Sequence, residues 1–135
     1  MFSRFNPASR RVLRIAEQEC RNHSQYYVGA EHLLAALLEE RDPSVLHSLE
    51  AAGIDASEVH AEVRRALGMG DDRLWEGILV TPRLRKIVAL AEQHAADREI
   101  APIDLYEALR AEGSSLAAEI LRRTQDGRNT TPAGE

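Results

Sequence analysis

An internal duplication constrains this chain more than any other feature of its sequence. Residues 6–18, which begin Asn-Pro and end Ala-Glu-Gln, match residues 81–93, which begin Thr-Pro and end Ala-Glu-Gln, at a constant offset of 75 residues. Each copy begins with a helix-capping residue and a proline suited to the first helical turn, and an apolar stripe of helical period follows. The offset then falls by three, so that residues 33–37 parallel residues 105–109. The chain therefore uses one helical unit twice.

Caps, prolines and glycines divide this pattern into seven predicted helices. Four belong to the first unit: one from Pro7 to about Cys20, one from Ala30 past Leu38, one from Pro43 to near Gly53, and one from Asp55 to Gly68. Three belong to the second: one after Thr81-Pro82, one from Pro102 to Gly113, and one capped by Ser114. The sequence therefore predicts an all-α fold, a pseudo-twofold repeat of a four-helix unit whose second unit is truncated.

The predicted boundaries place repeat one at residues 1–67, a linker at 68–80, repeat two at 81–123 and a disordered tail at 124–135. The linker has no helical period, and the tail has too little apolar content to pack. Trp75, in the linker, is predicted either to pack between the repeats or to form a surface anchor. Since the second unit has no fourth helix, we expect apolar surface to be exposed near Leu116 and Ile120 unless a partner covers it.

Composition agrees with helices packed on helices and argues against several functions. The hydrophobic fraction is 44% but only 4% of residues are aromatic. No apolar run reaches the roughly 18 residues that span a bilayer, and the first residues lack the apolar stretch of a secretory signal, so we expect a cytoplasmic protein without membrane contact. The net charge of −5 opposes nucleic-acid binding. Cys20, the only cysteine, lies in an apolar helical pattern and is expected to be buried.

Motifs for catalysis and cofactors are missing from the sequence. The five histidines form no His-Glu-x-x-His or cysteine-based metal spacing, and there is no phosphate-binding Gly-x-x-x-x-Gly-Lys loop. No serine or cysteine nucleophile with a positioned base is visible. We therefore expect a binding module that is not an enzyme and that needs neither a cofactor nor a metal.

The sequence resembles the N-terminal domain of the Clp unfoldases, particularly the ClpC and ClpA type, over nearly its whole length up to about Arg123. The residues that carry the resemblance are Met1-Phe2 with Arg4-Phe5, Arg11-Val12-Leu13, Tyr27-Val28-Gly29-Ala30-Glu31-His32-Leu33-Leu34, and Val80-Thr81-Pro82-Arg83 with Lys86. The resemblance implies a pseudo-twofold helical domain that recognises protein substrates or adaptor proteins and delivers them to a Clp ATPase and protease system. It implies either the front part of a longer unfoldase or a stand-alone adaptor or ligand sink.

Glu31 is the main site residue that the resemblance implies. In ClpC-like domains the glutamate of each Gly-x-Glu-His motif helps to bind phosphoarginine, a degradation mark. The second copy has Ile103 at this position, and an aliphatic side chain cannot pair with a guanidinium group, so a surviving site would be single. The alternative interpretation of Glu31 is structural, because a carboxylate in the first turn of a helix stabilises the helix dipole by roughly 0.3 to 1 kcal/mol.

The other implied ligand contacts surround the starts of the two proline-initiated helices, where cyclic-peptide toxins bind ClpC-like domains. The candidate peptide-binding residues there are Phe2, Asn6, Arg10, Thr81, Pro82 and Lys86. For Asn6 and Thr81 the alternative is capping, and for Phe2 and Phe5 it is packing of the chain end.

Arginine-rich helix faces suggest a different function. Arg10, Arg11 and Arg14, together with the cluster Arg83, Arg85 and Lys86, could form basic surfaces that bind nucleic acid or an acidic partner. The alternative for these residues is an ordinary solvated helix face.

Overall fold

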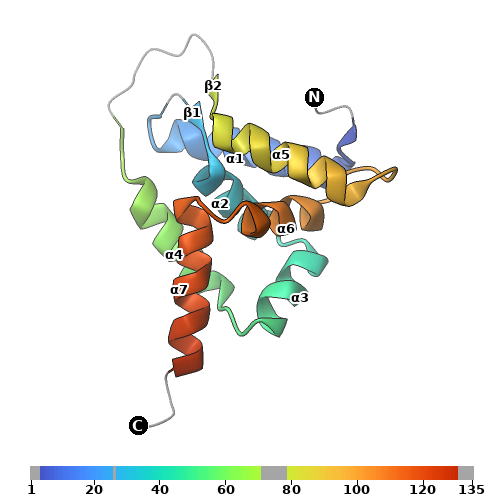
Figure 1. Cartoon of the computed structure of the whole chain (residues 1–135). Coiled ribbons are helices and arrows are strands. Elements are labelled where there is room, and N and C mark those ends of the chain that lie inside the picture. Colours follow the sequence, from blue (N-terminus) through green and yellow to red (C-terminus); the bar gives the residue numbers. More distant parts are fainter. Residues whose placement is uncertain (1–3, 26, 71–78, 131–135) are drawn as a thin grey trace.

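The computed structural model describes residues 4–25, 27–70 and 79–130, and within these ranges the fold is built from helices (Figure 1). The seven helices are α1 (Pro7–Asn22), α2 (Ala30–Glu40), α3 (Pro43–Ala51), α4 (Ala56–Leu67), α5 (Pro82–Ala95), α6 (Pro102–Glu112) and α7 (Leu116–Thr130). Two short strands, β1 (Tyr27–Val28) and β2 (Leu79–Val80), complete the described elements. The prediction of an all-α fold is confirmed.

The helices begin where the sequence offers a cap. Asn6 Oδ1 accepts a hydrogen bond from the Ser9 amide at 2.8 Å, and Thr81 Oγ1 accepts one from the Leu84 amide at 3.1 Å. Asp42 and Asp55 cap α3 and α4 in the same way. Each cap satisfies an amide group that has no partner within its own helix. The duplicated Asn-Pro and Thr-Pro pairs therefore fix equivalent starts for α1 and α5.

Helix α2 forms the centre of the core. Eight of its eleven residues are buried, so it is covered on almost every side, whereas α1, α4 and α5 each bury one apolar stripe. Helix α1 packs on α2 as α5 packs on α6, and α7 crosses both α2 and α4. Elements of both repeats therefore surround α2.

The two repeats are joined by the backbone segments that precede α1, α2, α5 and α6. In this reciprocal exchange, each of these lead-in segments pairs with a lead-in segment of the other repeat. Val28, before α2, pairs in parallel with Val80, before α5, and the Thr81 amide donates to Val28 O at 3.1 Å. In the equivalent place, Phe5 before α1 bridges to Ile100 before α6, and the Asn6 amide donates to Ile100 O at 2.9 Å. Each repeat thus uses the other repeat to satisfy the backbone in front of its first helix.

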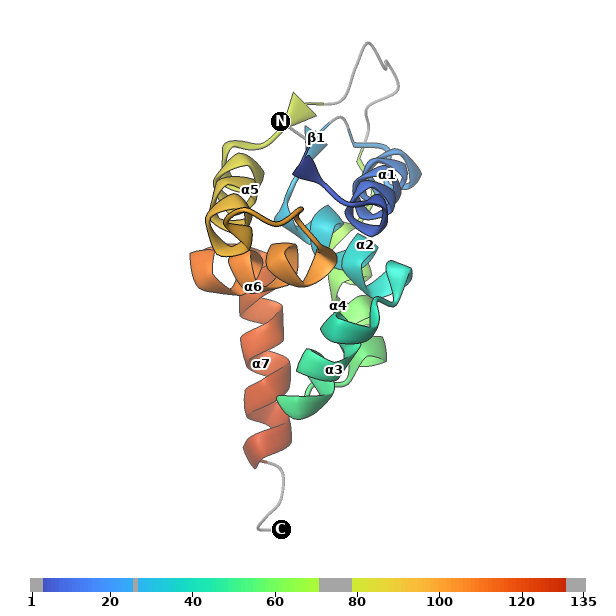
Figure 2. The same ribbon diagram turned by 90° about the vertical axis from the view of Figure 1, so that its right-hand side faces the viewer.

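In this arrangement α1 and α5 run in opposite directions on the two sides of the paired strand segments, α1 over α2 and α5 over α6 (Figures 1 and 2). The start of α1 lies at the end of α5, because the Arg4 guanidinium donates to the backbone carbonyl groups of Ala96 and Arg98. The start of α5 lies beyond the end of α1, beside β1. The two helix starts are therefore at opposite ends of the α1–α5 pair.

Two predicted boundaries of the first repeat and the linker need correction. Helix α1 runs to Asn22, a little beyond the predicted end at about Cys20. The predicted linker 68–80 includes a strand, since Leu79 and Val80 pair with β1, and it begins with an anchored turn, because the Gly70 amide donates to His23 O at 2.7 Å. Trp75 lies outside the described residues.

The predicted tail is also wrong in its first part, because α7 continues to Thr130. Thr124 is buried, and Gln125 Oε1 accepts a hydrogen bond from Arg110 at 3.2 Å. A helix that is already formed gains one backbone hydrogen bond for each residue it adds, which favours its extension without an apolar stripe. Residues 131–135 lie outside the described residues.

The expectation of exposed apolar surface holds for Leu116 but not for Ile120. Leu116 is 45% exposed, whereas Ile120 is buried in the contact of α7 with α4. The start of α7 also differs from the expectation, because Ser115 rather than Ser114 accepts the capping hydrogen bond, from the Ala118 amide at 3.0 Å. The helix is therefore docked on the first repeat.

The buried lead-in residue Phe5 provides a test of the exchange. Phe5 is 0% exposed, so Phe5→Ala removes a full aromatic side chain from the core and should lower the free energy of unfolding by about 3 to 5 kcal/mol. Urea denaturation followed by circular dichroism measures the change. Leu79→Ala is the control, since Leu79 is 63% exposed on the other lead-in segment. A loss of under ~1 kcal/mol for Phe5→Ala would contradict the packing described here.

Candidate functional site

An apolar pocket lies where the two repeats meet. Its lining residues come from α1, α5 and the two strands, and they are Leu13, Glu17, Val28, Val80, Leu84 and Val88. Leu13 and Val88 occupy equivalent positions in the duplication, and Val28 pairs with Val80. Apolar side chains from both repeats therefore converge at one surface position, as in sites that bind apolar groups of a ligand.

The start of α5 brings Thr81 and Glu31 together over Gly29. A Cβ atom placed on Gly29 would lie 3.5 Å from Thr81 Cγ2 and 3.7 Å from both Thr81 Oγ1 and Glu31 Oε1. Gly29 thus lies between a hydroxyl group and a carboxylate, both within ordinary van der Waals distance of that position. Three residues that the sequence associates with binding, Glu31, Thr81 and Pro82, share this end of the α1–α5 pair.

Glu31 also supports the fold directly. Its Oε2 accepts a hydrogen bond from the Ala117 amide, at the start of α7, at 3.1 Å. The structural interpretation predicted a role at the start of α2; the structure adds a contact with the start of a second helix, where a carboxylate stabilises unpaired amide groups and the positive end of the dipole. Glu31 therefore has one oxygen on the start of α7 and the other close to Gly29.

His32, the next residue of the motif, is a buried cap. Its Nδ1 accepts a hydrogen bond from the Gly29 amide at 3.0 Å, and its Nε2 lies 2.7 Å from Gln25 Oε1. Gln25 in turn donates to Leu67 O at 2.8 Å. Because a backbone N–H faces Nδ1, the proton of the neutral ring belongs on Nε2. Burial lowers the pKa of His32 to about 4, with the nearby charge of His23 acting in the same direction.

The second repeat replaces this pair of residues. Ile103 stands at the position of Glu31, and Asp104 stands at the position of His32. Asp104 is fully buried and accepts hydrogen bonds from the Ala101 amide at 2.9 Å and from Arg98 at 2.8 and 3.0 Å. Burial opposes its ionisation, but the hydrogen bonds from Arg98, Ala101 and His94 outweigh burial and hold the pKa of Asp104 below its ordinary value.

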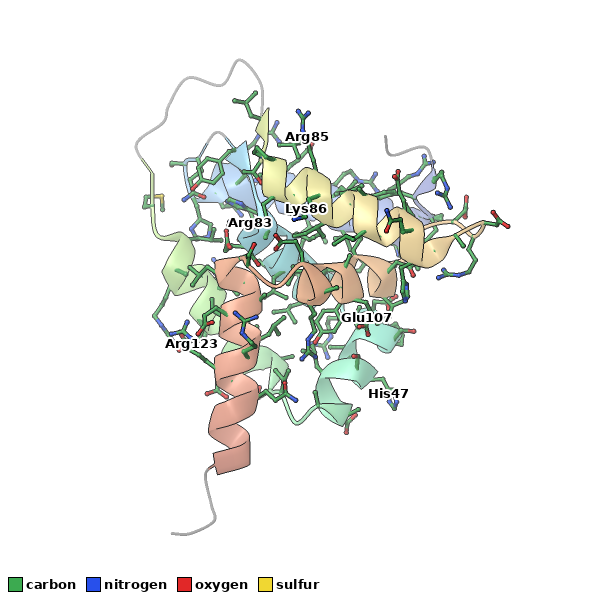
Figure 3. All side chains as sticks on the ribbon, in the orientation of Figure 1. His47, Arg83, Arg85, Lys86, Glu107 and Arg123 are labelled. Atoms are coloured by element: carbon green, nitrogen blue, oxygen red, sulfur yellow. The ribbon has the colours of Figure 1, made fainter. Side chains whose placement is uncertain are left out.

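The positive side chains near the pocket differ in their partners. Arg10 Nε donates to Phe5 O at 3.0 Å, and Arg11 forms an ion pair with Glu40 at 2.8 Å. Arg83 lies 3.9 Å from Glu112, whose pKa is lowered by hydrogen bonds from Ser114 and, more weakly, by the charges of Arg83 and Lys86. Figure 3 shows Arg83 and Lys86 on the side of α5 toward α6 and the start of α7, and Arg85 on another side. Part of the predicted basic surface is therefore matched by carboxylates.

The structure divides the predicted site residues between two places. Glu31, Thr81 and Pro82 lie at the start of α5, and Asn6 and Arg10 lie at the start of α1, beside Ile100. Lys86 is exposed on α5 one turn after the cap. Phe2 lies outside the described residues. The predicted residues in the described ranges thus lie in two places, one at each helix start, rather than in one cluster.

Sequence reasoning missed three residues that shape these sites: His32, Asp104 and Ser115. The first two stand three residues after a helix cap, at matching positions of the duplication, and that alignment could have identified both as capping side chains. Ser115 could have been found only by choosing between two adjacent serines, which capping preference does not distinguish.

Among the described residues, no group of three or more His, Cys, Asp or Glu side chains is placed to hold a metal ion. Nor is any helix in those ranges long and apolar enough to cross a membrane.

Comparison with known proteins gives the following matches. A family model described as the Clp repeat (R) N-terminal domain matches residues 4–124. Among curated proteins, the chain is 27% identical over 124 residues to the chaperone protein ClpB of Oceanobacillus iheyensis and, at the same identity and length, to the negative regulator of genetic competence ClpC/MecB of Bacillus subtilis. Both alignments cover 90% of this chain and 15% of the relative. The chain therefore spans about one seventh of the length of these relatives.

Solved structures agree on the fold. The N-terminal domain of ClpD from Arabidopsis thaliana superposes with a TM-score of 0.72 at 20% identity, covering 96% of this chain and 90% of that domain. The Hsp104 N-terminal domain from Candida albicans superposes with a TM-score of 0.74 at 16% identity, covering 93% and 87%. At these identities the likeness concerns the fold.

The buried His32 predicts a dependence of stability on pH. Its pKa is about 4 in the folded chain and about 6.5 in an unfolded one, so its contribution is complete above pH ~6.5 and is lost as the pH falls toward 4. The unfolding free energy of the native protein relative to His32→Gln should therefore drop by up to about 3 kcal/mol over that window. Urea denaturation at several pH values measures this difference. A difference that stays constant with pH would contradict a neutral, buried His32.

Proposed function

The chain belongs to the Clp repeat (R) N-terminal domain family, and on that premise we propose that it is a recognition module for protein substrates or adaptor proteins of a Clp ATPase and protease system. We propose that the domain binds exposed side chains and short unfolded segments of these proteins. The motor and the peptidase are supplied by other modules or other chains. In this proposal the domain selects and holds protein ligands, and it catalyses no reaction.

The observation that carries the proposal is the apolar pocket between α1 and α5. Val28 and Val80, one from each repeat, both line it, and Leu13 and Val88 approach from the two helices. Unfolded segments differ from folded surfaces by exposing aliphatic and aromatic side chains, which bind apolar pockets by leaving water. A pocket at the joint of two rigid repeats fits that class of ligand.

The finer part of the proposal is one phosphoarginine-type site at the start of α5. Glu31 Oε1 supplies a carboxylate oxygen for a guanidinium group, and the Thr81 hydroxyl group and the positive end of the α5 dipole favour a phosphoryl group. The equivalent place at the start of α1 has Asn6 but carries Ile103 instead of the glutamate. The proposal therefore assigns one such site to this chain. Cyclic peptides directed against ClpC are the second ligand class that we propose for the two helix starts.

The pocket is tested by placing a charge in it. Leu13 is half-buried at the pocket, and Leu46 is half-buried on α3, away from it. Leu13→Glu should weaken binding of a fluorescein-labelled, unstructured peptide rich in Leu, Val and Phe by at least about tenfold, because an apolar contact is replaced by a carboxylate that must stay hydrated. Fluorescence anisotropy measures the affinity.

Leu46→Glu is the matched control and should bind the peptide as the native protein does. Equal loss in both variants would point to general destabilisation, which circular dichroism detects. A properly folded Leu13→Glu protein with native affinity would refute the pocket as the binding place.

Glu31 requires a variant that separates its two roles. Glu31→Gln keeps a carbonyl oxygen for the Ala117 amide but removes the charge, whereas Glu31→Ala removes both. Glu31→Gln should melt close to the native temperature and bind a phosphoarginine peptide at least about tenfold more weakly, since a charge-assisted pair is lost. Glu31→Ala should also lose about 0.5 to 2 kcal/mol of stability. Calorimetric titration and thermal denaturation give the two quantities.

The gain-of-site variant is Ile103→Glu, which restores the missing carboxylate at the half-buried start of α6. It should raise the number of bound phosphoarginine peptides from about one to about two.

Unchanged phosphoarginine affinity in Glu31→Gln would remove Glu31 from the site, even if the apolar pocket still binds unfolded peptides.

A further inference from the structure

A second groove lies on another side of the second repeat, between α5 and α6. It is lined by Leu90, Gln93 and His94 of α5 and by Glu107, Ala108 and Ala111 of α6. Its floor contains the buried Ala108, and its rim contains the exposed Ala111. None of its residues belongs to the pocket between α1 and α5.

The duplication identifies the counterpart of this groove in the first repeat. The offset of 75 relates Leu90, Gln93 and His94 to Ile15, Gln18 and Glu19, and the offset of 72 relates Glu107, Ala108 and Ala111 to Ala35, Ala36 and Glu39. These counterparts lie on the contact of α1 with α2. The same surface therefore occurs twice in the molecule, and the two copies can be compared.

In the first repeat, α4 packs on α2 and covers the α2 side of this surface. His60 of α4 reaches Glu39 at 3.2 Å, and Arg64 of α4 places its charge near Glu19. Only 4% of the Glu19 side chain is exposed, whereas 53% of the side chain of its counterpart His94 is exposed. The second repeat ends its described part with α7, which packs on α2 and α4 of the first repeat. No helix in the described ranges takes the place of α4 on the second copy.

Compared with its counterpart in the first repeat, the groove keeps an apolar surface on which a helix can pack, but the charged side chains around it differ. Leu90, Ala108 and Ala111 offer an apolar strip, and Glu107 introduces a carboxylate where the first repeat has Ala35. His94 Nδ1 lies 2.6 Å from the buried carboxylate of Asp104, which directs the Nδ1 proton to that carboxylate and leaves Nε2 for another partner. Arg98, at the same end, is engaged by Asp104 on both terminal nitrogens.

We propose that the groove between α5 and α6 binds a basic amphipathic helix of a partner protein, which takes the place on the second repeat that α4 takes on the first. The seat accepts a helix, because its counterpart holds one. Glu107 at the groove favours a lysine or arginine on the incoming helix, and the net charge of −5 favours approach of a basic segment. This inference uses a surface separate from the proposed substrate pocket, and the two can fail independently.

The probe is a synthetic helical peptide of about 16 residues with capped ends. It carries Val, Val and Leu at the spacing of Val59, Val63 and Leu67, the buried stripe of α4, and lysines on the flanking positions. The control peptide has glutamates in place of the lysines. The lysine peptide should bind at least about tenfold more tightly than the glutamate peptide. Amide chemical shifts should change around Leu90, His94, Glu107 and Ala111.

Two matched variants locate the site. Ala111→Lys adds bulk and a positive charge at the groove, and Ala89→Lys adds the same side chain at an exposed position of α5 that does not line it. Ala111→Lys should weaken the lysine peptide at least about tenfold, and Ala89→Lys should leave it unchanged. Both substitutions replace an exposed helical alanine, so both proteins should fold.

Three results would overturn the proposal. The first is no binding of the lysine peptide by a folded protein. The second is chemical-shift changes confined to the pocket between α1 and α5. The third is self-association of the chain that Ala111→Lys abolishes, because this result would assign the groove to a second copy.

Discussion

The exchange of lead-in segments between the repeats is the constraint on which the rest of the structure depends. Phe5 pairs with Ile100, and Val80 pairs with Val28, so each repeat completes the backbone of the other. The amides of Asn6 and Thr81 find their acceptors only through this exchange. It also places α1 and α5 on either side of the apolar pocket and brings the start of α5 close to Gly29 and Glu31.

The two repeats share this backbone framework, so the side chains that differ between them determine where a ligand could bind. Glu31 has become Ile103, and a neutral, buried His32 has become the ionised Asp104, which Arg98 and His94 hold. In the proposed phosphoarginine-type site, a cationic ligand group would therefore meet a carboxylate at one helix start and a hydrocarbon at the other. The third difference is that, within the described residues, no helix covers the second repeat as α4 covers the first, and His94 is half-exposed where Glu19 is buried. The two repeats therefore share the same helical framework but differ in the side chains on their surfaces.

The framework could be predicted from the sequence because its signals are local. Caps such as Asn6 and Thr81, the prolines beside them and the apolar stripes act within one helix, and the duplication relates the two halves. The contact of Glu31 with Ala117 joins residues 86 positions apart and leaves no periodic signal. The strand of Leu79 and Val80 is too short to show an alternating pattern, and Ile120 was expected to be exposed because periodicity does not show which repeat a helix packs on.

The reciprocal exchange also bears on how the chain matures as it is synthesised. Ser9, in the first turns of α1, donates its hydroxyl hydrogen bond to Ile100 O, across 91 positions of sequence. The ribosome makes the first repeat before Ile100, so the contacts of Phe5 and Ser9 with Ile100 cannot form while α2 to α4 emerge. Contacts this distant form late, after the entropy of closing a long loop has been overcome. Residues 5–9 are therefore made before the rest of the two repeats and are among the last to be secured, because the bridge of Phe5 to Ile100 can form only after Ile100 has been made.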